Sequence, residues 1–153
     1  MLPLTLATGR LAAAPESVLA VGVAGVLDTK RSAQSRIEHH FQSAWWWDLR
    51  PYMAAGVAGD GAYHVGAGLA RRWQLGRQSR LMIGTGPAMY RRHDGFDLGN
   101  DIEFFSFVQA DRQVGREHWI GLRAAHVSNA HLGRRNPGRE MLGLVYTRAW
   151  RRY

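Results

Sequence analysis

Short segments in which large apolar residues alternate with glycine or polar residues recur along the whole chain, and they constrain its fold most strongly. About eight such segments of roughly ten residues are separated by charged or Gly/Asp-containing turns. Side chains two residues apart on a strand share a face, so the pattern predicts an all-β chain. The segments are Val18–Leu27, Ala33–Phe41, Leu49–Ala58, Ala62–Trp73, Arg80–Arg91, Asp101–Asp111, His118–Ser128 and Met141–Trp150.

Glycines inside these segments argue against helices. Each would cost about 1 kcal/mol in a helix, whereas strands of a small barrel tolerate glycine where the interior is crowded. One face of a segment is large and apolar, and the other is small or polar. The segment beginning at Ala62 shows this, with Tyr63, Val65, Ala67 and Leu69 opposing His64, Gly66, Gly68 and Ala70.

An even number of ten-residue strands, apolar on one side, predicts an eight-stranded antiparallel transmembrane β-barrel. A soluble eight-stranded barrel of the lipocalin or streptavidin type is the alternative, but glycines and charges on the inner face argue against it. Aromatic residues near the segment ends fit the girdles of a membrane barrel. They are Trp45, Trp46, Trp47, Trp73, Tyr90, Trp119, Tyr146, Trp150 and Tyr153.

The chain of 153 residues is long enough for one domain, and we assign residues 15–153 to a single barrel. Residues 1–14 combine an apolar run with small residues, which is typical either of a secretory signal remnant or of a disordered tail. We favour the signal remnant. Cysteine is absent, which excludes disulfides and thiolate metal sites.

The formal net charge is +8, and nearly all of the positive charge is arginine. Arginine binds phosphate in a planar, bidentate manner. Nucleic acid, an anionic membrane surface and a phosphorylated lipid are therefore all compatible partners. The charge alone does not choose among them.

The segment His118–Ser128 carries the residues with catalytic chemistry. His126 and Ser128 are two residues apart and share a strand face, within hydrogen-bond reach of each other. A serine nucleophile needs such a base, because its hydroxyl loses a proton as it attacks. The same face holds Ile120, Leu122 and Ala124, whereas Arg123 has the opposite parity and is expected inside the barrel.

Glu140 begins the apolar face of the last segment. Antiparallel pairing of the last two segments brings it opposite His126, where a carboxylate orients the imidazole and stabilises the imidazolium. A polar trio facing lipid is costly, and it makes sense if the substrate itself lies in the bilayer. Alternatively, the three residues lie at the membrane rim, and the His-x-Ser spacing is a coincidence among seven histidines.

The stretch His126–Ala130 (His-Val-Ser-Asn-Ala), followed by Asn136–Glu140 (Asn-Pro-Gly-Arg-Glu) and a last strand, resembles the signature of the PagL-type lipid A 3-O-deacylases. The detailed match covers the C-terminal third. The resemblance implies a serine carboxylic-ester hydrolase in the outer membrane of a Gram-negative bacterium, acting on lipid A of lipopolysaccharide. It further implies that no metal or other cofactor takes part.

By this resemblance Ser128 is the nucleophile, His126 the general base and Glu140 the orienting carboxylate. The Asn129 side chain or local backbone N–H groups, including that of Ala130, are candidates for stabilising the oxyanion. Phe104 is expected to line the acyl groove. The chain departs from the family pattern at His131, where glycine is common, and at Phe105 and Ser106, where acidic residues are expected.

For the arginines near the site and for the overall function, the sequence leaves more than one interpretation open. Arg134, Arg135 and Arg139 flank the site, either as ligands of lipid phosphates or as solvated loop arginines. His39 and His40 lie on opposite faces of a strand, which argues against a metal site. Non-catalytic and nucleic-acid-binding barrels are the rival functions, although the apolar stripe argues against nucleic acid as a partner. Homodimer formation is left open.

Overall fold

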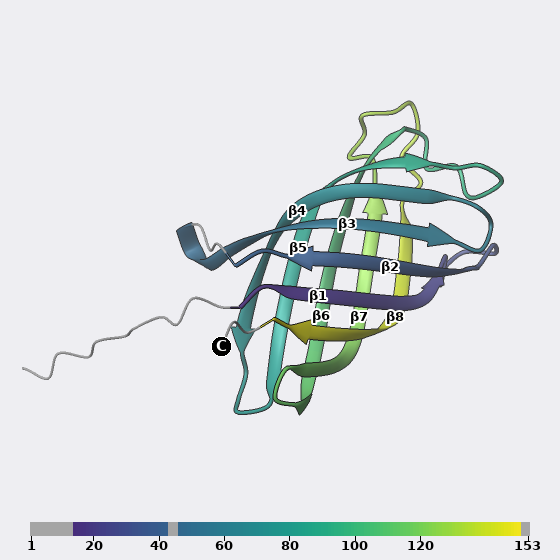
Figure 1. Ribbon diagram of the computed structural model, residues 1–153. Helices are drawn as coiled ribbons and strands as arrows, with labels where there is room; N and C mark the ends of the chain where they lie inside the picture. Colours follow the sequence, from purple (N-terminus) through teal and green to yellow (C-terminus); the bar gives the residue numbers. More distant parts are fainter. Residues whose placement is uncertain (1–13, 43–45, 151–153) are drawn as a thin grey trace, which may run out of the picture.

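The computed structural model describes residues 14–42 and 46–150 (Figure 1). The predicted signal remnant or tail, apart from Ala14, lies outside the described residues, as do Trp45 and Tyr153. In the described part of the chain, no helix is long and apolar enough to cross a membrane.

Eight antiparallel strands form one closed barrel, in which each strand pairs with its sequence neighbours and β1 pairs with β8. This confirms the predicted fold. The 3₁₀ helix η1 (Trp46–Asp48) precedes β3. The strands are β1 (Glu16–Ala24), β2 (Ser32–His40), β3 (Leu49–Ala58), β4 (Tyr63–Gln74), β5 (Ser79–Arg91), β6 (Ile102–Gly115), β7 (His118–Ser128) and β8 (Arg139–Ala149).

The strand boundaries follow the sequence pattern closely. The bounds of β3 and β7 are those predicted. The first strand ends earlier than expected, at Ala24, because Gly25 has a φ of 75° and turns the chain. The Gly25 N–H donates to the Glu140 carbonyl at 2.8 Å, which joins this turn to the start of β8.

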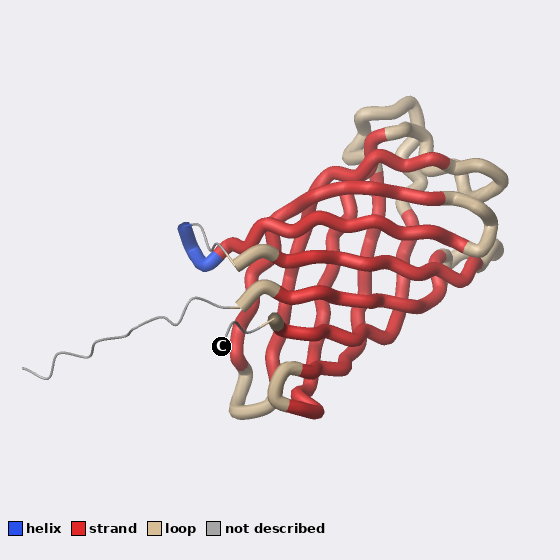
Figure 2. The backbone as a smooth tube through the Cα atoms, in the orientation of Figure 1, coloured by secondary structure: helices blue, strands red, loops and turns tan. Residues whose placement is uncertain are grey.

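The two ends of the barrel differ (Figure 2). The β5–β6 connection (92–101) and the β7–β8 connection (129–138) lie together at one end, while the β4–β5 and β6–β7 turns lie at the other. Outer-membrane barrels have short periplasmic turns and longer extracellular loops. The end with the two longer connections therefore corresponds to the extracellular side, and we call it the loop end.

The inside of the barrel is charged. Glu38 accepts hydrogen bonds from Arg36 (2.7 Å) and Arg123 (2.6 Å) and pairs with His40 (2.9 Å). Nearer the end of the barrel opposite the loop end, Glu16 pairs with Arg80 at 2.8 Å. Burying a charge costs free energy unless it is paired, so these networks allow the narrow interior to be filled by long polar side chains. The predicted inward position of Arg123 is confirmed.

The outer face is largely apolar. Large side chains such as Val65 and Leu144 are 57% and 63% exposed, and Ile37 and Leu122 resemble them. A soluble barrel would place polar residues outside and a dry core inside. The observed arrangement is the reverse, and it confirms the membrane barrel over the soluble alternative.

Candidate active site on the outer face of β7 and β8

Pairing between β7 and β8 brings together residues that are distant in sequence. His126 and Glu140 are direct cross-strand partners. Both have even parity, the parity of the exposed residues Leu122 and Leu142 on the same strands, so their side chains face outward. The predicted juxtaposition of the histidine and the carboxylate is therefore present in the structure.

The imidazole and the carboxylate are in contact. His126 Nδ1 lies 3.3 Å from Glu140 Oε1, and the two side chains are 48% and 40% exposed. An Nδ1–H directed at a carboxylate leaves Nε2 unprotonated in the neutral ring, and an unprotonated nitrogen is what a general base requires. Both side chains are therefore partly open to the surroundings.

Ser128 follows on the same face at the end of β7. It is half-buried, and its direct partner on β6 is the outward-facing, half-buried Phe104. In the described part of the chain no hydrogen bond joins the Ser128 hydroxyl to His126. Their Cα atoms are separated by about 6.7 Å along the strand, a span that a serine and an imidazole bridge by rotation of their side chains. Such contacts are often loose before substrate binds.

Gly138 shapes the space around the imidazole. It has a φ of 61°, a region that favours glycine. A Cβ at this position would lie 2.8 Å from His126 Cε1 and 3.3 Å from Nε2. Glycine therefore lets the loop backbone pass against the edge of the ring that carries the basic nitrogen.

Asn129 organises the loop that follows the serine. Its side chain is fully buried, and Nδ2 donates to the carbonyls of Leu98 (2.9 Å) and Arg135 (2.6 Å). Its Oδ1 accepts from the His131 N–H at 3.0 Å, and its own N–H donates to Asn136 Oδ1 at 3.0 Å. Both N–H groups of this amide are thus engaged within the loop.

Ala130, next after Asn129, adopts a φ of 51° and is exposed. Non-glycine residues rarely adopt positive φ, and they cluster at functional sites. Among the described residues, none accepts a hydrogen bond from the Ala130 N–H. Of the two residues expected to stabilise an oxyanion, Ala130 is the one with a donor available.

The β5–β6 connection contacts the β7–β8 loop and holds it in place. Asp97 pairs with Arg135 at 3.0 Å and with Arg92 at 3.1 Å. Gly99 lies against Arg135, where a Cβ would approach the Arg135 carbonyl oxygen to 2.4 Å. The sequence pattern indicated only turns here, because nothing in it shows that two loops so far apart in the chain touch.

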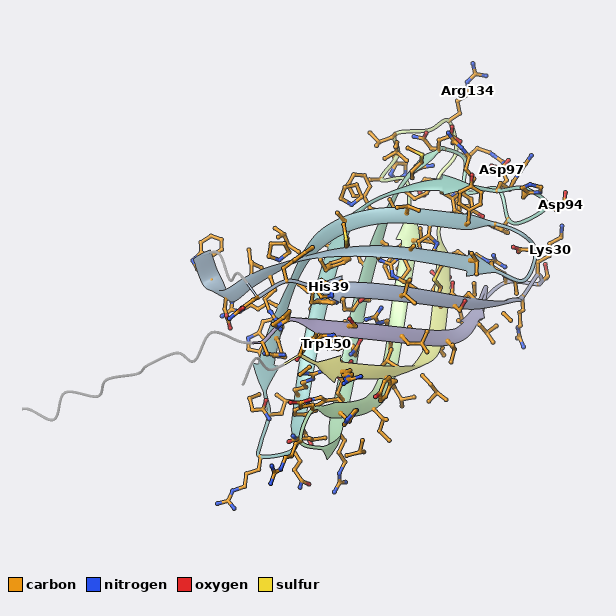
Figure 3. The ribbon with its side chains drawn as sticks, in the orientation of Figure 1. Lys30, His39, Asp94, Asp97, Arg134 and Trp150 are labelled. Carbon is orange, nitrogen blue, oxygen red and sulfur yellow. The ribbon has the colours of Figure 1, made fainter. Side chains whose placement is uncertain are left out.

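The arginines near the site separate into different roles. Arg139 is buried inside the barrel, donates to the Lys30 carbonyl at 2.8 Å and lies 3.4 Å from Asp28. Its odd parity in β8 was the signal for that inward position. Arg134 is exposed at the loop end, where Figure 3 shows it pointing away from the barrel. Arg134 and Arg135 thus remain on the surface near the site.

His39 and His40 lie on opposite faces, as their spacing predicted. His39 faces outward beside Ser17 at 3.3 Å, and His40 faces inward beside Glu38. Figure 3 shows His39 and Trp150 at the end opposite Arg134. In the described ranges, no group of three or more His, Cys, Asp or Glu residues is arranged to hold a metal.

A closed barrel with a charged interior, an apolar exterior and an exposed histidine–carboxylate pair defines an outer-membrane protein with a polar site facing the lipid. The model of the lipid A 3-O-deacylase (PagL) family matches residues 32–148. The chain therefore belongs to this family of outer-membrane hydrolases, as the C-terminal motif suggested. Fold and family together place it in the outer membrane of a Gram-negative cell.

Solved structures with a similar fold include the crystal structure of the outer membrane enzyme PagL, at 24% identity and a TM-score of 0.65, covering 88% of this chain and 99% of that one. A designed transmembrane β-barrel has 9% identity and a TM-score of 0.64, with 90% and 96% covered. Neisserial surface protein A has 12% identity and a TM-score of 0.60, with 88% and 94% covered. A comparison with curated proteins found no match.

Proposed function

We propose that this protein hydrolyses the ester bond of the acyl chain at position 3 of lipid A, with Ser128, His126 and Glu140 as a catalytic triad. The observation that carries the proposal is the cross-strand pair of His126 and Glu140 on the outer face, with Ser128 on the same face. Membership of the family supports the substrate. A lipid substrate would reach this outward-facing site from within the membrane.

In the first half of the reaction, the Ser128 Oγ attacks the ester carbonyl carbon while His126 Nε2 accepts the hydroxyl proton. Glu140, at Nδ1, stabilises the imidazolium that results. The tetrahedral intermediate collapses as the bond to the sugar oxygen breaks. The imidazolium returns its proton to that oxygen, which leaves as a free hydroxyl and yields an acyl-enzyme.

In the second half, a water molecule gives a proton to His126 and attacks the acyl-enzyme carbonyl. Release of the carboxylic acid returns the proton to Ser128. The negative oxygen of each tetrahedral intermediate is stabilised by the Ala130 N–H, which lies in the loop directly after the nucleophile. Asn129 keeps that loop in place, and the apolar ring of Phe104 lines the path of the acyl chain.

The test is mass spectrometry of lipid A from Gram-negative cells that express either the parent chain or Ser128→Ala. The parent is expected to remove one acyl chain. Ser128→Ala is expected to leave lipid A intact, because loss of a serine nucleophile lowers the rate by about 10⁴-fold or more. Ser17→Ala is the matched control, since Ser17 also faces outward but lies at the opposite end.

Intact lipid A in cells that contain the folded parent would refute the proposal and favour a non-catalytic barrel. Removal of the chain by Ser128→Ala as well as by the parent would refute the role of Ser128.

A further inference from the structure

An open groove crosses the outer face near the end of the barrel opposite the loop end, and the proposed triad makes no use of it. The groove has a volume of about 710 Å³ and extends over β8, β1, β2, β3 and β4. It is lined mainly by apolar side chains, among them Leu19, Ile37, Ala55, Val65 and Ala67. Ligand pockets have volumes of roughly 300–1,000 Å³, so the groove has room for a hydrocarbon chain.

Polar side chains gather at the edge of the groove that lies toward the membrane surface. Arg148 on β8 pairs with Ser17 on β1, and Ser17 pairs with His39 on β2, so the three form one outward-facing row. Figure 3 shows His39 near this end of the barrel. The next outward-facing row toward the middle of the membrane contains Leu19 and Ile37, which are apolar.

Arg148 has no acidic partner at this edge. Its guanidinium carbon lies 4.3 Å from the ring centroid of Trp150, and in the described part of the chain no carboxylate forms an ion pair with it. Among the described residues that line the groove, Glu38 is the acidic one, and its side chain is bonded to Arg36 and Arg123 inside the barrel. Stacking on the indole orients the guanidinium and leaves its N–H donors for an external acceptor.

The side chains beside Arg148 also have a donor to spare. The Trp150 indole N–H donates to the Ser17 oxygen at 3.0 Å, and the same oxygen lies 3.3 Å from His39 Nδ1. The indole, the hydroxyl and the neutral imidazole carry three donors in all, and these two contacts use two of them in either tautomer of the histidine. Because an unused donor is costly next to hydrocarbon, this edge favours a ligand that is rich in acceptors.

A phosphate group matches the edge of the groove in both charge and hydrogen bonding. It is an anion with several acceptor oxygens, and arginine binds it through charge-assisted hydrogen bonds. This end of the barrel corresponds to the periplasmic side, where the leaflet of an outer membrane consists of phospholipids. A glycerophospholipid carries a phosphate next to its acyl chains, so the phosphate can lie at the polar row while one chain lies in the apolar groove.

We propose that the groove is a binding site for one glycerophospholipid of the periplasmic leaflet, with the phosphate at Arg148 and His39. One acyl chain lies along the apolar lining that includes Leu19, Ala55 and Ala67. The inference is independent of the proposed esterase function, because it concerns the opposite end of the barrel and a lipid that is not the substrate.

The test is native mass spectrometry of the full chain in detergent with dioleoylphosphatidylglycerol or with dioleoylglycerol, which has the same acyl chains but no phosphate. The parent is expected to bind one phospholipid about tenfold more tightly than the diacylglycerol, because hydrogen bonds to a charged group are lost with the phosphate. Arg148→Gln should lower the affinity for the phospholipid about tenfold and leave that for the diacylglycerol unchanged. Arg112→Gln is the matched control, since Arg112 is also exposed near this end, on β6, but lies outside the groove.

A second variant, Ala55→Phe, fills the groove and should weaken the binding of both lipids. Parent-like binding by folded Ala55→Phe would overturn the inference. Equal affinity of the parent for the two lipids, or equal losses in Arg148→Gln and Arg112→Gln, would also overturn it and leave Arg148 as an ordinary arginine of the membrane interface. Dimers of the parent that exclude the phospholipid would overturn it as well and assign the groove to a contact between copies of the chain.

Discussion

Inside the barrel the carboxylate of Glu38 is enclosed by Arg36, His40 and Arg123. On the outer face the carboxylate of Glu140 pairs, among the described residues, only with His126, at 3.3 Å. The four side chains of this interior cluster are buried, and the other three are bonded to Glu38. The outer pair is about half exposed, and the adjacent Ser128 is joined to it by no hydrogen bond in the described part of the chain.

This difference separates polar residues that stabilise the fold from polar residues available for chemistry. Buried charges are tolerated only when they are paired, so the interior network has little capacity to bind anything else. Polar groups facing lipid are costly, and those of this pair that remain unbonded can gain partners from a substrate or from water at the membrane surface. Substitutions in the interior network should therefore lower the stability of the barrel, whereas substitutions at the outer pair should lower its activity.

The largest effect on folding is expected from Glu38→Ala. Removing the carboxylate leaves Arg36 and Arg123 buried without their partner, which should lower the free energy of unfolding by about 3–5 kcal/mol. Denaturant titration in lipid vesicles measures the loss. The control is Ile37→Ala, on the same strand but facing outward, which should lose much less. Equal stability of Glu38→Ala and the parent would show that the network does not stabilise the barrel.

Glu140→Gln should have the opposite signature, a loss of turnover with little loss of stability. Glutamine keeps the shape but lacks the charge that stabilises the imidazolium, and we expect kcat to fall about 10⁴-fold. Steady-state kinetics measures this, with Asp94→Asn, an exposed loop carboxylate, as the control. Unchanged kcat would remove Glu140 from the proposed triad.

Gly138→Ala tests whether the close approach of the loop to His126 matters. The added Cβ would lie 2.8 Å from His126 Cε1, at a backbone φ that disfavours alanine, so we expect about a tenfold loss of kcat. Gly76→Ala is the matched control, because a Cβ there meets nothing within 4 Å. Similar activity of the two variants would contradict this role of Gly138.

The smallest effect is expected from Asp97→Asn. Its partners Arg92 and Arg135 are exposed, and exposed ion pairs contribute at most about 1 kcal/mol. The β7–β8 loop should loosen slightly, with about a twofold loss of activity that shrinks at high salt because the parent's ion pairs are then screened. A loss that is independent of salt would point to another role for Asp97.

Much of the candidate site could be predicted from the sequence, because strand geometry determines which side chains share a face and which lie opposite each other. His126 and Ser128 share a face through the two-residue period, and antiparallel pairing of the last two segments brings Glu140 opposite His126. The contacts between the loops around the site could not be predicted in this way. The bonds from Asn129 to Leu98 and the ion pair of Asp97 with Arg135 join loops whose approach depends on how the barrel closes.

The sequence by itself determined the eight strands, the outward apolar face and the inward position of Arg123, because each depends on a period of two along a strand. Only the tertiary structure decided that Glu38 is the partner of Arg123, that both amide N–H groups of Asn129 are engaged in the loop, and that Arg148 and His39 lie in one row at the edge of the same groove. These contacts depend on strand register and barrel closure, which link residues across the whole chain and leave no local pattern in it.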